Sequence, residues 1–260
     1  MKRLHFDYTM QIHYSEPVST CHYTIKCIPP DTDRQRLEKT EITLSAKEDP
    51  GRSRDSFGNQ ILYGRVEGDH TDFSFHIAGD VSVNRTACES KGKEAMLGLF
   101  RYPHGLAVPG EELAAYYRTL KLTGSAYEKG AALMHRLYQD YAYEKNVTDI
   151  HTTAEEAWRL GRGVCQDYAH IMIALARLEG IPARYVCGML VGEGYSHAWA
   201  ELLCENGWYA FDPTNNLVVT DSHIKLGVGR DAGDCEINRG VMHGGGIQTQ
   251  QISVSVTEKG

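Results

Sequence analysis

Apolar and polar residues alternate with a period of two over much of the first hundred residues. The clearest run is His5–Tyr14, and Cys21–Cys27 repeats the pattern. Such alternation predicts strands that bury one face. Three further candidate strands are Thr40–Leu44, Ile61–Val66 and Phe73–Ile77. Turn signals rich in proline and glycine separate these runs, so we expect residues 1–100 to form an antiparallel β-sandwich domain.

The pattern changes to a helical period after a linker that contains proline and glycine, at residues 102–110. Apolar residues recur at helical spacing over Tyr127–Tyr141 and again over Cys165–Leu178, which predicts a helix in each segment. Thr152 and Thr153 each stand three residues before a glutamate. This spacing is the capping-box signature for the start of another helix between the two.

Strands follow the last of these helices. They are predicted at Ala183–Val191, Ser196–Cys204 and Gly207–Phe211, and Ile252–Val256 alternates as a further strand. A tight turn at Asn206-Gly207 joins the second and third strands as a hairpin. Residues 101–260 are therefore predicted to form a second domain, in which helices pack on an antiparallel sheet, and the fold class is α+β.

Three residues in this second half carry the candidate chemistry. Cys165 opens the most apolar helix, His197 lies in a predicted strand, and Asp212 follows the next strand. The start of a helix stabilises a thiolate, as does a nearby imidazolium. A turn centred near residue 206 brings His197 and Asp212 within a few residues of register, where a carboxylate can orient an imidazole. The order Cys, His, Asp predicts cysteine-dependent acyl transfer at an amide.

Glycines and backbone amides support this prediction. Gly161 and Gly163 allow a sharp turn into the helix and leave space for a substrate. The backbone N–H of Cys165 is a candidate donor to an oxyanion, because amides in the first turn of a helix have no partner within it.

Composition narrows the remaining classes of function. The chain has 260 residues and a net charge of −7, so we expect it to bind neither nucleic acid nor membranes. The N-terminus lacks an apolar signal segment, and no apolar stretch is long enough to span a bilayer; we expect a cytoplasmic location. The seven cysteines are irregularly spaced and no zinc motif occurs, so we expect no metal and no cofactor.

Other residues near the three are candidates for contact with a substrate. Asp167 either caps its helix or touches the substrate. Tyr195, Ser196 and Trp199 flank the histidine and are predicted to line the cleft. A mixed cluster of charges lies towards the C-terminus, and it either binds a charged group of the substrate or forms a salt-bridged loop; its members are Arg230, Asp231, Asp234, Arg239 and His243.

At these residues the sequence resembles the transglutaminase-like superfamily. The resemblance rests on residues 161–170, on Gly180–Val186, on Ser196–Trp199 and on Trp208–Thr214. Parts of the first hundred residues and of the tail are similar to a bacterial branch with a β-sandwich before the core. Two positions depart from the family pattern: Gln166 stands where many relatives carry arginine, and Ala232-Gly233 replaces an expected aromatic residue.

The resemblance implies a papain-like core with Cys165 as nucleophile, His197 as general base and acid, and Asp212 as orienting residue. It leaves the reaction open. Hydrolysis of a peptide, a protein side chain or a small amide is favoured, because water needs no second binding site. Transfer to an amine is the alternative, and a non-catalytic binding module that keeps the fold is another. The N-terminal domain is also a candidate site for a protein partner.

Overall fold

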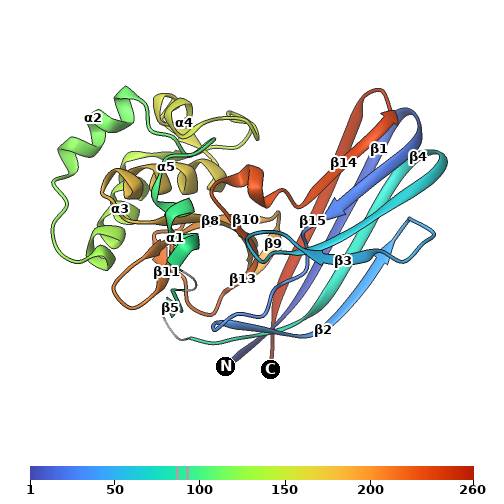
Figure 1. The fold of residues 1–260 in the computed structure, drawn as a ribbon, viewed down its shortest axis with the longest axis horizontal. Helices are drawn as coiled ribbons and strands as arrows, with labels where there is room; N and C mark the ends of the chain where they lie inside the picture. Colours follow the sequence, from blue (N-terminus) through green and yellow to red (C-terminus); the bar gives the residue numbers. More distant parts are fainter. Residues whose placement is uncertain (86–87, 92–93) are drawn as a thin grey trace.

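The structure is a computed structural model that describes residues 1–85, 88–91 and 94–260. Two antiparallel sheets and a group of helices make up the fold (Figure 1). The α+β class predicted from the sequence is confirmed. The first sheet has the order β2-β4-β1-β15-β9, with β14 also paired to β1 and β3 to β4. Its strands are β1 (Lys2–Ile25), β2 (Gln35–Leu44), β3 (Gly51–Arg54), β4 (Gln60–Val83), β9 (Gly192–Gly194), β14 (Asn238–Gly244) and β15 (Gln248–Lys259).

Strands β1 and β4 are long, and each joins two of the strands predicted from the sequence. Their pairing is irregular between His13 and Val18. β15 borders the first half of β1 and β14 borders the second half. Tyr23 in the second half lies against Phe73, which pairs with Ile12 in the first half; the two ring centroids are 5.1 Å apart. The predicted sandwich is therefore built from one sheet whose two halves face each other.

The second sheet has the order β12-β11-β10-β8-β13, and β5 is paired to β11. Its strands are β5 (Cys88–Glu89), β8 (Ala183–Leu190), β10 (His197–Leu203), β11 (Trp208–Asp212), β12 (Leu217–Val218) and β13 (His223–Gly229). The helices are α1 (Glu94–Arg101), α2 (Glu111–Leu120), α3 (Ala126–Asp140), α4 (Ala154–Leu160), α5 (Cys165–Leu178) and the 3₁₀ turn η1 (Ala232–Cys235). A short parallel pair, β6 (Ala142–Tyr143) with β7 (Arg162–Gly163), precedes α5.

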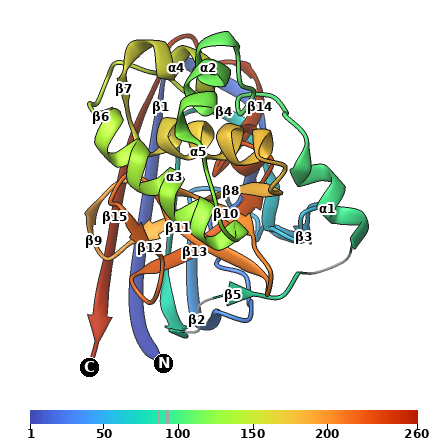
Figure 2. The ribbon, with the colours of Figure 1, turned by 90° about the vertical axis from the view of Figure 1, so that its left-hand side faces the viewer.

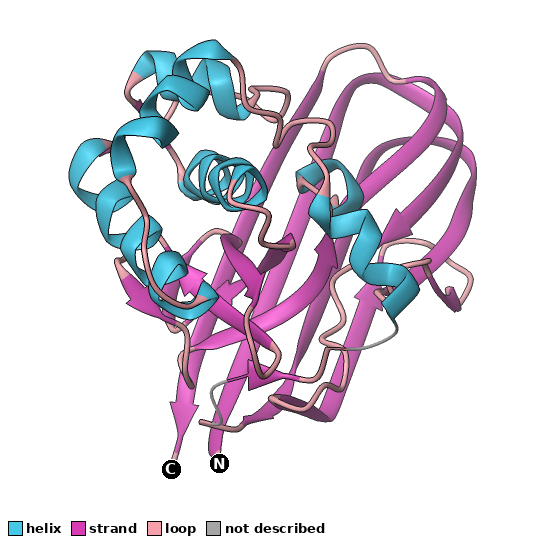
Figure 3. Ribbon diagram, turned by 60° about the vertical axis from the view of Figure 1, so that its left-hand side comes forward, coloured by secondary structure: helices cyan, strands magenta, loops and turns pink. Residues whose placement is uncertain are grey.

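Helix α5 is the centre of the second half of the chain. Every residue from Asp167 to Arg177 is buried. Its apolar side chains pack with Ala198, Ala200 and Leu202 of β10 and with residues of α2, α3 and α4. Helices α2 to α5 lie together, with α5 against β8 and β10, while α1 lies apart from this group (Figures 2 and 3). Because α5 is mostly apolar and buried all round, it is stable only as a helix enclosed on every side.

The second sheet contributes to both cores. Tyr185 and Cys187 of β8 pack with the helices, while Met189, Ile224 and Leu226 pack in the core of the first sheet. The two halves of the fold therefore share a buried apolar boundary. No helix in the described parts of the chain has the length and the apolar character needed to cross a membrane.

The predicted capping box forms at the start of α4, but with one of the two candidate pairs. Thr153 accepts from the Glu156 backbone N–H, and the Glu156 carboxylate accepts from Thr153. Glu155 instead caps α2, since its carboxylate accepts from the backbone N–H groups of Gly110, Glu112 and Leu113 at 2.9–3.1 Å. One short segment thus supplies the cap of two helices.

The two C-terminal strands were predicted to belong to the second domain, which begins at residue 101, but they lie in the first sheet. β14 and β15 belong to the first sheet, where Val254 lies opposite Tyr8 and Val256 opposite Phe6. β5, which precedes residue 100, pairs with the second sheet. Alternation in a strand shows which face is buried but not which strand lies beside it. In sequence, the second sheet and the helices therefore form an insertion between strands of the first sheet.

We expect Val256→Asp to lower the free energy of unfolding by about 3–5 kcal/mol, since it leaves an unpaired charge in the core of the first sheet. The matched control is Thr257→Asp on the exposed next residue, with an expected change within about 0.5 kcal/mol. Urea unfolding measures both. Equal effects of the two substitutions would contradict the placement of β15.

Candidate active site

Cys165 is the first residue of α5. The chain reaches it through Gly161, which ends α4 in the left-handed region at φ 67°, and through Gly163. A Cβ on Gly163 would come within 2.4 Å of Asp167 Oδ2 and of the Tyr141 hydroxyl. The two glycines therefore allow α4 to end and α5 to begin within four residues.

Asp167 has the capping role that was one of its two predicted alternatives. Its Oδ2 accepts from the Val164 backbone N–H and from the Thr148 hydroxyl, both at 2.7 Å. The side chain is fully buried, and burial raises the pKa of its carboxyl. It is thus enclosed behind Cys165 and holds the start of α5 in place.

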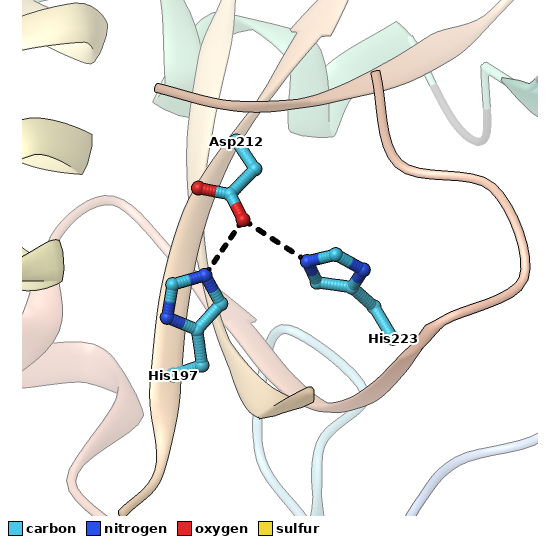
Figure 4. A group of neighbouring side chains, drawn as sticks. All are labelled: His197, Asp212 and His223. Carbon is cyan, nitrogen blue, oxygen red and sulfur yellow. Dashed lines mark hydrogen bonds and ion pairs between the residues drawn. The ribbon is translucent and has the colours of Figure 1, made fainter. Parts of the chain in front are cut away.

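The predicted hairpin positions the histidine and the aspartate. β10 and β11 pair with Ala200 opposite Phe211 and Leu203 opposite Trp208, and the turn closes with a bond from Cys204 N–H to the Gly207 carbonyl. Gly207 is required there, because a Cβ would lie 2.1 Å from the Glu89 carbonyl oxygen. Within this frame His197 Nε2 lies 2.8 Å from Asp212 Oδ2 (Figure 4).

Asp212 is a fully buried carboxylate. Its Oδ2 accepts from His197, from His223 at 3.1 Å and from the Asn215 side chain at 2.7 Å. Its Oδ1 accepts from the backbone N–H groups of Thr214 and Asn215. Burial alone would raise the pKa of this carboxyl, but the two histidines and Asn215 outweigh it, so the pKa falls far below its usual range. Asp212 is therefore an anion at any moderate pH.

The carboxylate of Asp212 in turn favours the charged form of His197. Burial favours its neutral form, yet hydrogen bonds to Asp212 and to Cys165 outweigh burial and raise its pKa to about 10. Because Nε2 faces Asp212, the ring nitrogen left for the sulfur is Nδ1. The structure thus brings together all three residues singled out in the sequence, with the imidazole between the thiol and the carboxylate.

His223 is a site residue that the sequence analysis missed. It begins β13, is 3% exposed, and directs Nε2 at the same oxygen of Asp212 that His197 uses (Figure 4). Its Nδ1 lies 2.9 Å from the Ser222 hydroxyl. Burial lowers its pKa, so it stays neutral and donates to Asp212. The Ser-His pair before an alternating Ile-Lys-Leu run was the available signal, but nothing local connects it to Asp212.

The two histidines and the aspartate are also the group in the described residues with spacing suited to a metal, because their ligand atoms all lie within 4.8 Å of one another. Both imidazoles, however, aim a ring nitrogen at one carboxylate oxygen, at 2.8 and 3.1 Å. These are hydrogen-bond distances, and they satisfy the three groups as they stand.

The three other predicted substrate contacts lie in different surroundings. Ser196 lines a cavity of about 690 Å³ between the two sheets. Tyr195 is 64% exposed, and Lys145 Nζ lies 5.2 Å from the centre of its ring. Trp199 is a correction: it is 1% exposed and packs edge-on against His223, at 5.1 Å between ring centroids. Its ring also lies 6.2 Å from that of His197, so it packs against both histidines, and it does not line the cavity.

Two alternatives were predicted for the mixed cluster of charges towards the C-terminus. Most of its members form the salt-bridged loop. Arg230 and Asp234 pair at 2.8 Å, and Asp231 accepts from the Gly233 backbone N–H. Arg239 lies 3.9 Å from Glu236, while His243 lies apart, near Ser19. Arg239 also lines the cavity between the sheets.

All seven cysteines are free thiols. Cys165 and Cys88 are partly exposed and the other five are buried. Burial raises the pKa of each of those five, that of Cys187 to about 12 with a further contribution from Cys165. The buried thiols thus stay protonated at neutral pH and are poor nucleophiles.

Known proteins resemble this chain in sequence and in fold. An uncharacterized protein of Mycobacterium leprae is 38% identical over 125 residues, which is 44% of this chain and 44% of that relative. An uncharacterized protein of Mycobacterium tuberculosis is 28% identical over 269 residues, which is 90% of this chain and 85% of the relative. A crystal structure from Cytophaga hutchinsonii, described as a "putative cysteine protease", has a TM-score of 0.80 at 22% identity and covers 99% of this chain and 91% of its own.

Two families match separate parts of the chain. Residues 4–82 match the bacterial transglutaminase-like N-terminal region. Residues 114–213 match the transglutaminase-like superfamily, and this segment includes Cys165, His197 and Asp212. The resemblance seen in the sequence is thereby confirmed: one part of the chain matches the transglutaminase-like superfamily, and the part before it matches the bacterial transglutaminase-like N-terminal region.

Proposed function

We propose that this protein is a cysteine-dependent hydrolase of amide bonds, with Cys165 as nucleophile, His197 as acid and base, and Asp212 as orienting residue. The observation that carries the proposal is the position of His197, whose Nε2 lies 2.8 Å from the buried carboxylate of Asp212 and whose raised pKa reflects both that carboxylate and the thiol at the helix start. An imidazolium and a helix N-terminus both stabilise a thiolate.

In the first step, the sulfur of Cys165 attacks the carbonyl carbon and a C–S bond forms. The backbone N–H of Cys165, in the first turn of α5, is the candidate donor that stabilises the oxyanion. His197 gives its proton to the departing nitrogen as the C–N bond breaks. A thioester and a free amine result, and His197 is left neutral.

In the second step, His197 takes a proton from water, and the hydroxide attacks the thioester. The C–S bond breaks, a carboxylic acid is released, and the thiolate and imidazolium are restored. If an amine replaces water, the same residues produce a new amide and the enzyme is a transferase. The substrate class we propose is a peptide or a protein side-chain amide.

The two charged groups make the stability of the site depend on pH. The lowered pKa of Asp212 stabilises the fold fully above about pH 3.9, its unfolded pKa, and this contribution is lost as the pH falls further. The raised pKa of His197 stabilises the fold fully below about pH 6.5, and this contribution is lost as the pH rises to about 10. Both contributions are complete between about pH 4 and 6.5.

We expect Asp212→Asn to destabilise the protein most within that window, since it removes the partner that keeps His197 charged. The loss in free energy of unfolding should be greatest near pH 5.5 and smaller at pH 9.5, as measured by urea unfolding. Asp69→Asn at an exposed position of β4 is the control and should have little effect at either pH. A loss that does not vary with pH would contradict the ion pair.

The hydrogen bond from His223 gives a separate prediction. His223→Leu removes a buried donor to a charged group and should cost about 1.5–3 kcal/mol in free energy of unfolding. His223→Gln keeps an N–H donor and should cost less. The surface control is His13→Leu, which breaks the exposed contact to Asp72 and should change stability by less than about 0.5 kcal/mol. Equal costs for the leucine and glutamine variants would mean that the bond to Asp212 does not matter.

The nucleophile is tested by alkylation with iodoacetamide at about pH 6, read as intact mass. Because Cys88 is the other partly exposed thiol, the comparison uses a Cys88→Ser background. We expect one rapid adduct, which disappears in Cys165→Ala and forms more slowly in His197→Ala. Equal, slow labelling of the parent and His197→Ala would refute an activated pair and favour a binding module that keeps the fold.

The two outcomes of acyl transfer are then separated with a glutamine-containing peptide, in buffer alone and with added alkylamine. Release of a carboxylic acid in both mixtures supports hydrolysis. Formation of the alkylamide in the second mixture would assign the enzyme as a transferase.

A further inference from the structure

A cavity of about 690 Å³ lies between the first sheet and the core that holds Cys165. This volume is typical of ligand pockets. One wall comes from β1, β14 and β15, and the other from the start of α5, from β8 and from η1. Both halves of the fold are therefore needed to form it.

The inner wall of the cavity is apolar. Met10, Ile12 and Tyr14 point to the same side of β1, because alternate residues of a strand share a face. Tyr23 and Phe73 complete this wall. The rim is polar: Gln248, Gln250 and Asn238 lie at it, together with Arg239 and Glu236, which are 3.9 Å apart. Side-chain amides both donate and accept hydrogen bonds, as a peptide backbone requires.

The cavity borders the candidate active site. Gln166 follows Cys165 directly and Ser196 precedes His197, and both line the cavity. Tyr185 and Cys187 of β8 also line it. A molecule in the cavity thus lies beside the segments that carry Cys165 and His197.

One polar group in the inner wall is unpaired. The Tyr8 hydroxyl is buried near Ser196, yet no group in the described residues stands in hydrogen-bonding geometry to it. A buried hydroxyl without a partner is costly. A carbonyl group inside the cavity would satisfy it, which points to an occupant that is apolar but carries amides.

We infer that this cavity binds an apolar peptide segment next to the amide that Cys165 attacks, and that the first sheet is the wall that selects it. The inference rests on the proposed function for the position of the reacting bond, but not for binding itself. It gives the N-terminal region a direct part in substrate recognition.

The test uses Cys165→Ala protein, which binds but does not cleave. The probes are two fluorescein-labelled hexapeptide amides with the same ends, one with Phe-Leu at its centre and one with Ser-Asn. We expect the apolar probe to bind at least about tenfold more tightly by fluorescence polarisation. Ile12→Trp, which fills the cavity, should abolish this preference. Gln11→Trp on the opposite, exposed face of β1 is the matched control and should keep it.

Equal binding of the two probes, or an unchanged preference in a folded Ile12→Trp protein, would overturn the inference. A second measurement does not depend on how that variant folds. A probe with benzoylphenylalanine in place of phenylalanine is photo-cross-linked to Cys165→Ala protein and mapped by mass spectrometry. Cross-links to β1 or β15 support the inference, and cross-links elsewhere refute it. Because neither experiment needs catalysis, failure here is distinct from failure of the alkylation test of Cys165.

Discussion

The structure depends on one buried anion. The Asp212 carboxylate is removed from water and receives five hydrogen bonds, from two imidazoles, one side-chain amide and two backbone N–H groups. These donors come from three features: the hairpin partner, the turn after β11, and the start of β13. A buried carboxylate is tolerated only with such compensation. The turn and the return of β13 are thus constrained by the same charge that orients His197.

Local signals made much of the second half of the chain predictable. Helix α5 has the bounds expected from its apolar period, Cys165–Leu178, because its start and its glycine stop are encoded within a few residues. The hairpin of β10 and β11 was predictable because the turn signal Glu205-Asn206-Gly207 separates two apolar runs, and the turn closes within it, between Cys204 and Gly207. The register of this hairpin is enough to bring His197 near Asp212. The residues of the turn and the alternation of the two strands therefore determine how close these two side chains lie.

The features that the sequence did not predict depend on contacts between distant segments. His223 reaches Asp212 because β13 pairs with β8. The residues around His223 in the sequence contain no sign of this pairing. Trp199 was predicted to line the cleft beside the histidine, but the alternation of β10 turns it into the core. The return of β14 and β15 to β1 was hidden for the same reason: a strand shows its buried face but does not specify its neighbour.

That return affects how the chain acquires its structure during synthesis. Arg3 pairs with Lys259, so β1 emerges from the ribosome long before β15 is available to cover its edge. Until then one side of a 24-residue strand keeps unpaired backbone groups, which invites pairing with other chains. The enclosed core, with its local helices and hairpin, can fold meanwhile. Completion of the first sheet, and with it the wall opposite Cys165, is then a late step that follows the emergence of the C-terminal strands.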